Sequence, residues 1–482
     1  MIERAKTAIR RILPKKTFAR GVSVLVGGTA AAQLLSLLAA PVLTRLYTPD
    51  DFGLLAVYGG LLALISVVSS LRYELAIPLP EDDQEAANVV VLCLLLVFGT
   101  SVLSALVLLF FGANLAQALG SPQLAGYFWL LPMGVLLGGT YTVFNYWSIR
   151  TKCFATVAVT RIRQALATIV IQLLAFKAGG VALLFAQVAG QSVGTASLAK
   201  PALERPLFTS VTWCGIFRIA TRYRRFPLFS TPGALFNNAG STLNPVLISA
   251  LFSTAAAGVF SLSHRVISMP MGLVGSAIGQ VFLSQSVDAN RAGTLGSLVV
   301  EVQSRLIRIA LPPTMILILF GPDLFGFIFG QEWYKAGEFS RWMAIWLFFQ
   351  FIVSPLSMIF SVLSKEHQYV VWQGALFVLS ISSLLSGSIF ASVGVGVALL
   401  SMTSAVCYAA LSIWLWLVSG ASIINVLKGF VVSLLTCILC FIPALIVLFL
   451  GGNLVFSIIG ITASLFLVAL YFLKVLRSIA SI

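Results

Sequence analysis

The sequence predicts an all-α polytopic membrane protein with about fourteen transmembrane helices. Of its 482 residues, 59% are hydrophobic and only 9% are charged, and the mean hydropathy is +1.02. Uncharged runs long enough for a spanning helix of about 20 residues recur along the whole chain. Only helices and closed barrels satisfy their backbone hydrogen bonds in lipid, and these runs lack the alternation of barrel strands.

The apolar runs divide the chain into two helical bundles and two further helices. We expect spans near 21–44, 52–72, 87–112, 124–148, 156–176, 180–199, 227–251, 257–283, 303–321, 340–363, 370–391, 394–418, 428–450 and 453–474. These give a basic cytoplasmic segment at 1–20, an N-terminal six-helix bundle at 21–199 and a basic cytoplasmic linker at 200–226. A C-terminal six-helix bundle at 227–418 and two additional transmembrane helices at 419–482 complete the chain.

The positive charges predict the orientation. The formal net charge is +15, and 25 of the 30 Lys and Arg residues fall in alternate loops that share one side with the N-terminus. Four lie in the opposite loops, and Arg265 lies within a span. By the positive-inside rule both termini are cytoplasmic, with anionic membrane lipids rather than nucleic acid as the partner of the basic loops. We expect the first apolar run to remain in the protein as a transmembrane helix rather than to be removed as a signal peptide.

Two segments resemble each other at an offset of about 204 residues. Gln33 aligns with Asn237, and Pro41-Val-Leu aligns with Pro245-Val-Leu. Gly53 aligns with Gly258 after a one-residue insertion. Six predicted helices separate the two copies, and an even number preserves their orientation. This predicts a parallel repeat, related by an axis along the membrane normal, with a seam between the halves.

Polar side chains recur at helical spacing on three spans that we expect at this seam. The candidate cavity residues are Gln33, Asn237, Asn244, Ser261, Arg265 and Ser268. A single Ser, Asn or Gly is more often ordinary helix packing in membranes. Arg265 differs, because a central arginine costs about 2.5–3.5 kcal/mol to insert. Its own helix face is small and polar, which favours a wet cavity; snorkelling or a structural hydrogen bond is the alternative.

The sequence contains no motif for several kinds of binding and catalytic site. All fifteen acidic residues fall outside the middle of the predicted spans, with Glu74 the nearest case. A cavity with a cation and amides but no carboxylate suits an anionic ligand, because the arginine fork matches phosphate oxygens. No nucleotide-binding phosphate loop and no metal-ligand spacing occur, so we expect no catalytic residues, no enzyme activity, no metal and no cofactor. The Cys437-x-x-Cys440 pair and His264 indicate helix packing.

Several motifs along the chain carry a family resemblance. They include Leu43-Thr-Arg45-Leu-Tyr-Thr-Pro49 with Phe52-Gly53, and Arg72-Tyr-Glu74-Leu-Ala-Ile. Arg225-Phe-Pro227, Ser-Leu-Ser-His-Arg265 and Gly330-Gln-Glu-Trp333 follow later. With these the chain resembles the polysaccharide-transporter branch of the multidrug/oligosaccharidyl-lipid/polysaccharide (MOP) exporter superfamily, the Wzx-like flippases of O-antigen and capsule repeat units.

The resemblance implies an alternating-access transporter of two six-helix bundles in the bacterial inner membrane. It implies an undecaprenyl-pyrophosphate-linked oligosaccharide substrate, moved from the cytoplasmic to the outer leaflet for surface polysaccharide synthesis. Polysaccharide polymerase machinery is the implied protein partner, and Arg265 is the position that fits a pyrophosphate contact. Two alternatives stay open: a cation-coupled exporter of small molecules in the same superfamily, and a membrane assembly factor that transports nothing.

Overall fold

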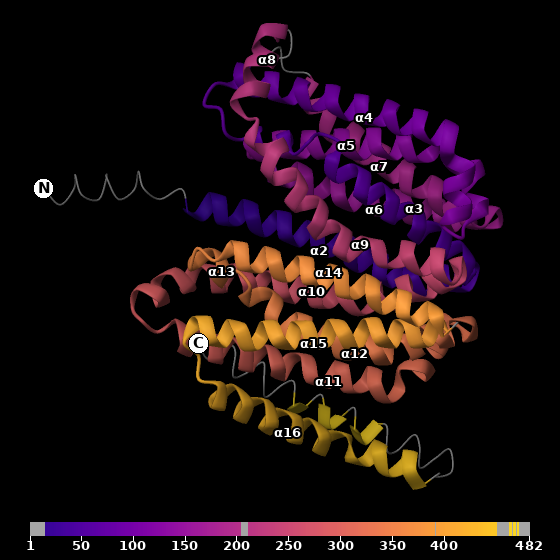
Figure 1. The fold of residues 1–482 in the computed structure, drawn as a ribbon, viewed down its shortest axis with the longest axis vertical. Helices are drawn as coiled ribbons and strands as arrows, with labels where there is room; N and C mark the ends of the chain where they lie inside the picture. Colours follow the sequence, from indigo (N-terminus) through magenta and orange to yellow (C-terminus); the bar gives the residue numbers. More distant parts are fainter. Residues whose placement is uncertain are drawn as a thin grey trace, which may run out of the picture. The chain divides into compact units, whose positions relative to one another are not determined.

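The computed structural model describes an all-α chain, as the sequence predicts (Figure 1). The described residues are 15–203, 211–390, 392–450, 462–464, 466–468, 470 and 471. The expected basic segment at 1–20 and the last expected span at 453–474 lie largely outside them. By their internal packing the helices form two compact units, 1–262 with 328–333, and 263–327 with 334–482.

The first unit contains the helices up to the start of α10. Its α-helices are α2 (Lys15–Leu46), α3 (Pro49–Val68), α4 (Asp83–Ala118), α5 (Leu130–Arg150), α6 (Phe154–Leu174), α7 (Gly180–Leu203), α8 (Trp213–Arg222) and α9 (Thr231–Leu251). Short helical turns connect them: η1 (Tyr73–Ala76), η2 (Pro122–Tyr127), η3 (Phe176–Ala178), η5 (Phe226–Ser230) and η6 (Gln331–Trp333). Two apolar clusters form its core, one around Tyr73 and Trp147 and one around Tyr58 and Leu131.

The second unit contains most of α10 and the helices after it. Its elements are α10 (Thr254–Arg291), α11 (Leu295–Phe329), α12 (Tyr334–Val353), η7 (Ser354–Leu356), α13 (Ile359–Val362), α14 (Glu366–Ile389), α15 (Val393–Ser419) and α16 (Ile423–Leu450). One apolar cluster around Phe351, Phe360 and Trp416 forms its core. The span expected at 340–363 lies almost wholly within Gln331–Val362, which is long and apolar enough to cross a membrane, but its helix is irregular after Val353, where Pro355 has no N–H to donate.

Eleven helices in the described residues are long and apolar enough to cross a membrane. α5 and α9 have 21 residues each, the length of a span, but they are not among the eleven. Within α9 the described stretch Thr242–Leu251 is apolar but shorter than a span. The membrane class is therefore confirmed, and the total of fourteen spans stays a prediction.

Two helix-to-helix turns of the first unit repeat each other. α2 ends at Leu46 and α3 begins at Pro49; α9 ends at Leu251 and α10 begins at Thr254. The backbone N–H of Asp51 donates to Thr48 Oγ1 at 3.3 Å, which caps α3. The backbone N–H of Ala256 donates in the same way to Ser253 Oγ at 3.1 Å. Each hydroxyl satisfies an amide that the first helical turn leaves free.

The helices that leave these two turns touch through glycine. A Cβ atom on Gly53 would lie 1.9 Å from the carbonyl oxygen of Thr254. A Cβ atom on Gly258 would lie 1.9 Å from the carbonyl oxygen of Pro49. Because only hydrogen fits at either position, the backbones of α3 and α10 are in direct contact there.

A loop docks beside each of these turns. The Trp333 indole N–H donates to the carbonyl oxygen of Thr44 at 2.8 Å, and its ring meets Phe52 edge-on at 5.0 Å. At the second turn, the Ser249 hydroxyl donates to the carbonyl oxygen of Leu119 at 2.8 Å. The Thr254 hydroxyl donates to the carbonyl oxygen of Gly120, also at 2.8 Å. These hydrogen bonds fix both turns against their neighbours.

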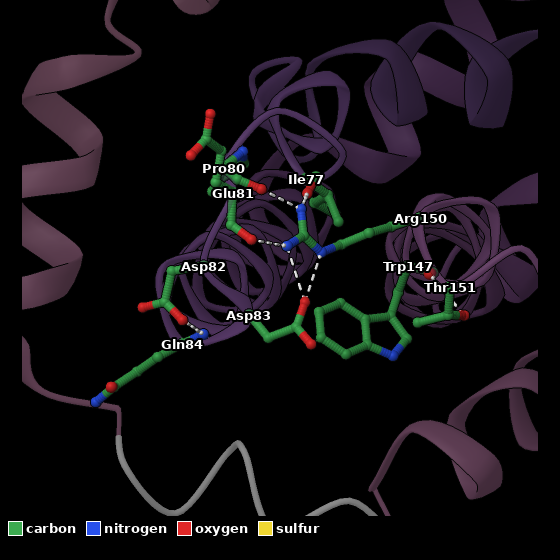
Figure 2. A network of polar contacts seen from close by, with 9 residues as sticks. All are labelled: Ile77, Pro80, Glu81, Asp82, Asp83, Gln84, Trp147, Arg150 and Thr151. Atoms are coloured by element: carbon green, nitrogen blue, oxygen red, sulfur yellow. Dashed lines mark hydrogen bonds and ion pairs between the residues drawn. The ribbon is translucent and has the colours of Figure 1, made fainter. Parts of the chain in front are cut away.

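At the other end of the first unit, Arg150 holds the segment between α3 and α4 (Figure 2). Its guanidinium donates to the carbonyl oxygens of Ile77, Pro80 and Glu81. It also forms an ion pair with Asp83 at 2.8 Å. An arginine has five N–H donors in a fixed fork, so one side chain can satisfy several carbonyl groups of a segment without regular hydrogen bonding.

Candidate membrane cavity

The second unit contains a cavity of about 400 Å³ between α10 and the end of α12. The lining residues on α10 follow one stripe of small and polar side chains. The complete lining is His264, Ser268, Met271, Gly272, Gly275, Ser276, Gly279 and Gln280 from α10, with Leu347, Gln350, Phe351, Ser354, Pro355 and Met358 opposite. The stripe forms because residues three, four and seven apart share one side of a helix.

Two of the glycines on this stripe, Gly275 and Gly279, allow α10 to approach Pro355 on the opposite cavity wall. A Cβ on Gly275 or on Gly279 would lie 3.6 Å from Pro355, which is an ordinary contact distance. Alanine would therefore fit at both positions but would narrow the cavity at this end. Pro270 interrupts the hydrogen bonding of α10 between Arg265 and these glycines, because proline has no backbone N–H.

The cavity wall offers polar groups that lack a protein partner. Gln350 Oε1 is buried and accepts no hydrogen bond within the described chain. The indole N–H of Trp346, one turn earlier on α12, is also buried without an acceptor in the described residues, although Trp346 is not part of the cavity lining. The Trp346 ring packs against the His264 ring with centroids 5.6 Å apart. Buried polar atoms are normally satisfied, so such atoms at a cavity indicate a place for water or a polar ligand.

Arg265 follows the cavity residue His264 on α10 and is exposed, but it is not among the residues that line the cavity. It follows the first residue of α10, Thr254, by eleven positions, which is about 16 Å along the helix axis. Gly272, a cavity residue, lies seven positions further and thus on nearly the same side of α10. No hydrogen bond or ion pair joins the guanidinium to any residue that the structure describes.

The other predicted cavity residues occupy different places. Ser268 lines the cavity of the second unit. Ser261 lies on α10 within the first unit, and its hydroxyl oxygen is buried without a hydrogen-bond partner in the described residues. Gln33 is half-buried on α2, and Asn244 is buried on α9. The backbone of Asn237 belongs to α9, but its side chain lies outside the described part of the chain.

Carboxylates are placed at helix ends throughout the described residues. Asp50 and Asp51 lie in the first turn of α3, and Asp288 lies in the last turns of α10. Glu74 is buried in η1, where the Ser70 hydroxyl donates to it at 2.5 Å and Arg72 lies 3.5 Å away. Glu74 is thus held by a local ion pair and a hydrogen bond, and no acidic residue lines the described cavity.

Sequence reasoning missed two amides of the cavity lining, Gln280 on α10 and Gln350 on α12. Gln280 extends the stripe of Gly272 and Ser276, and its helical spacing could have identified it. Gln350 stands in the run Trp346-Leu-Phe-Phe-Gln350-Phe, as one amide among apolar residues. An isolated amide in such a run is a usable signal, but only the tertiary packing shows that it faces α10 rather than another helix.

The fold is that of known membrane exporters. The structure matches lipid II flippase MurJ in an inward closed conformation with a TM-score of 0.72 at 14% identity, covering 95% of this chain and 99% of that one. It matches an inward-facing multidrug resistance MATE family transporter of the MOP superfamily with a TM-score of 0.55 at 18% identity, covering 82% and 93%. A MOP superfamily transporter from Pyrococcus furiosus matches with a TM-score of 0.51 at 15% identity, covering 83% and 95%.

Comparison with family models extends this likeness from fold to sequence. Curated protein sequences give no match to the chain. A family model described as polysaccharide biosynthesis protein matches residues 42–338, which is more than half of the 482 residues. That range contains the motifs from Leu43 to Trp333 that carried the family resemblance. The chain therefore belongs to the polysaccharide biosynthesis protein family and has the fold of the MOP exporters.

Proposed function

We propose that this protein flips undecaprenyl-pyrophosphate-linked oligosaccharide repeat units across the bacterial inner membrane. Movement is from the cytoplasmic to the outer leaflet, and it supplies surface polysaccharide synthesis such as O-antigen, capsule or exopolysaccharide. The observation that carries the proposal is Arg265, an exposed guanidinium at the depth of a span with no partner among the described residues. Membership of the polysaccharide biosynthesis family supports the same conclusion.

The cost of an unpaired arginine in lipid makes a ligand role for Arg265 the better explanation. Such a residue costs about 2.5–3.5 kcal/mol near the bilayer centre, and nothing in the described structure offsets that cost. A water-filled cavity removes most of it, and a diphosphate fits the forked guanidinium with paired charge-assisted hydrogen bonds. Ser268 on the same stripe and Gln350 opposite could then bind sugar or phosphate oxygens.

The likeness to MurJ fits a lipid-linked substrate. That protein is described as a lipid II flippase, so its fold accommodates a substrate with a lipid tail and a polar head. A small-molecule exporter is the alternative on the same fold, and it would need a group that holds a cation. The described cavity of this chain has no carboxylate, which favours the anionic substrate.

We infer that the two halves of the transporter form a parallel repeat, with both termini cytoplasmic and fourteen spans. A shift of 205 residues relates Pro49 to Thr254 and Gly53 to Gly258, and it also relates the ends of α2 and α9. The same shift exchanges the two close glycine contacts, because Gly53 meets Thr254 while Gly258 meets Pro49. Such reciprocal contacts are expected at a pseudo-two-fold axis.

The membrane potential can supply the driving force. The substrate diphosphate carries about two negative charges, and each is driven outward by about 2.3 kcal/mol per 100 mV of inside-negative potential. In vesicles with both pH values clamped, collapsing the potential should therefore slow transport. An unchanged rate would remove the potential as the source of energy but would leave the substrate assignment intact.

The proposal is tested by substitution of Arg265 in a strain that lacks its own flippase. R265A should abolish surface polymer, R265K should give an intermediate amount, and protein level and membrane insertion should stay normal. R291A is the matched control, because Arg291 is an exposed arginine in the last turn of the same helix. Normal polymer from R265A would refute the ligand role. Export of a cationic dye, unaffected by R265A, would favour the small-molecule exporter.

A further inference from the structure

Helix α8 is a short helix fixed to the first unit along one side only. Ile216 and Ile219 are buried, and α8 packs against α4. Thr212 caps α8 by accepting the backbone N–H of Gly215 at 3.1 Å. The Tyr73 hydroxyl donates to the carbonyl oxygen of Ala220 at 2.9 Å. These contacts hold α8 in a defined orientation.

The opposite side of α8 exposes aromatic rings. The side chains of Trp213 and Phe217 are 77% and 78% exposed, and they share one face because they lie four residues apart. Beyond the end of α8, Leu228 and Phe229 are 62% and 74% exposed. Large apolar side chains in this number are not left in water without a partner, because each would gain free energy by burial.

Arginines gather beside these rings. Arg218, Arg222, Arg224 and Arg225 are all exposed, and they line one open hollow together with Phe217 and Thr221. Arg222 forms an ion pair with Glu85 at 3.0 Å and lies over the Tyr223 ring at 5.5 Å. The guanidinium groups of Arg218, Arg224 and Arg225 meet no hydrogen-bond or ion-pair partner in the described residues.

The contacts of α8 place it where a span leaves the membrane. Arg222 reaches Glu85 and the backbone N–H of Thr212 reaches Asn88, and both acceptors lie in the first two turns of α4. α4 has 36 residues, more than a span needs, and its first residues are Asp83, Gln84 and Glu85. Figure 1 shows α8 at this end of α4. The loop charges predict that this is the cytoplasmic side.

We propose that α8 and the arginines that follow it bind anionic phospholipid headgroups of the adjacent leaflet. Trp213 and Phe217 enter the interface, where aromatic rings are favoured, and the guanidinium groups take up lipid phosphates. The pairing of rings and arginines on one helix at the end of a span fits a membrane surface better than a soluble acidic partner, which would leave the rings in water. The surface acts independently of the transported substrate.

Cys214 provides a reporter, because it is exposed on α8 next to Trp213. A variant with the other five cysteines replaced is labelled at Cys214 with an environment-sensitive fluorophore. The full chain is placed in phosphatidylcholine nanodiscs that contain an equal small fraction of spin-labelled phosphatidylglycerol or spin-labelled phosphatidylcholine. We expect the phosphatidylglycerol probe to quench more strongly, with a local enrichment of about fivefold for each unpaired arginine that reaches the headgroups.

High salt and charge removal test the cause of this preference. At about 1 M salt the screening length falls to about 3 Å, so the preference for phosphatidylglycerol should largely disappear while quenching by both lipids persists. The variant R218Q/R224Q/R225Q should show the same loss. The matched control R291Q/R308Q/K428Q removes three exposed charges from the same predicted side of the membrane and should retain the preference.

Three results would overturn the inference. Equal quenching by the two lipids in the labelled protein that keeps all its arginines would mean that α8 touches the bilayer without selecting anionic lipid. No quenching by either lipid would mean that α8 stands clear of the membrane. A preference that is lost in the control but kept in R218Q/R224Q/R225Q would assign the lipid contact to another surface. The salt titration needs no charge substitution, so it decides the question even if the triple variant misfolds.

Discussion

Replacing Gly53 or Gly258 by alanine tests the contact between α3 and α10 directly. The new Cβ of G258A would lie 1.9 Å from the Pro49 carbonyl oxygen and 2.6 Å from the Gly53 backbone nitrogen. Ordinary contact begins at 3.4 Å, so the shortest distance must grow by 1.5 Å, the difference between 3.4 and 1.9. Both neighbours are backbone atoms, which cannot rotate away as a flexible side chain can.

The expected loss of stability follows from two opposing effects. Overpacking of this kind costs about 1–3 kcal/mol, and rigid backbone neighbours favour the upper part of that range. Alanine in place of glycine within a helix recovers about 1 kcal/mol of helix propensity. We therefore expect G53A and G258A each to lower the free energy of unfolding by about 1–2 kcal/mol, and by similar amounts because their contacts are reciprocal.

Unfolding by sodium dodecyl sulfate in mixed micelles gives the measurement, and Gly59 supplies the control. Gly59 lies on α3 as Gly53 does, but a Cβ there would meet nothing within 4 Å. G59A should therefore be neutral or stabilising. The double variant G53A/G258A should lose less than the sum of the single losses, because one separation of the helices relieves both contacts. Strict additivity, or equal effects of G53A and G59A, would refute the reasoning.

Three further substitutions have effects set by hydrogen bonds. R150A should speed amide exchange in residues 77–83, because one guanidinium holds that segment, and R150K should restore little of the protection, since an ammonium lacks the fork. Q303L should lower the free energy of unfolding by about 1–3 kcal/mol, because it leaves the buried Trp416 indole N–H without its acceptor. The double variant Q303L/W416F, which lacks that N–H, should recover part of the loss. W333F should cost about 1 kcal/mol in the same unfolding assay, because it removes the indole bond to the Thr44 carbonyl.

The sequence predicts the helices better than their ends. The turn between α9 and α10 falls within a few residues of the expected boundary, because polar residues interrupt two apolar runs there. α10 was expected to end near 283 but continues to Arg291, since hydropathy marks the edge of the membrane while the helix extends through polar residues beyond it. α8 was not expected at all. Its ten residues are too short for a span, and its stability depends on packing against α4.

The part of the candidate site that lies on a single helix, α10, could be predicted from the sequence. Ser268 is visible because small polar residues recur at helical spacing within one apolar run, whereas Arg265, predicted from the same stripe, does not line the described cavity. Gln350 and Pro355 complete the cavity from α12 and η7, and their direction depends on tertiary packing that no local pattern encodes. The glycine alignment of Gly53 with Gly258 was visible in the sequence, but the direct contact of their helices was not.

The sequence of α10 gives this helix a stiff first part and a weaker second part. Seven residues, about 10 Å along the axis, separate Gly258 from Arg265, and no glycine or proline lies between them. That stretch therefore contains no residue that would weaken the helix locally. Beyond Arg265, Pro270 and the glycines at 272, 275 and 279 weaken the helix, so bending is concentrated there. A change in the direction of α10 would thus arise between Arg265 and Gly279 rather than between Gly258 and Arg265, because only the second stretch contains proline and glycine.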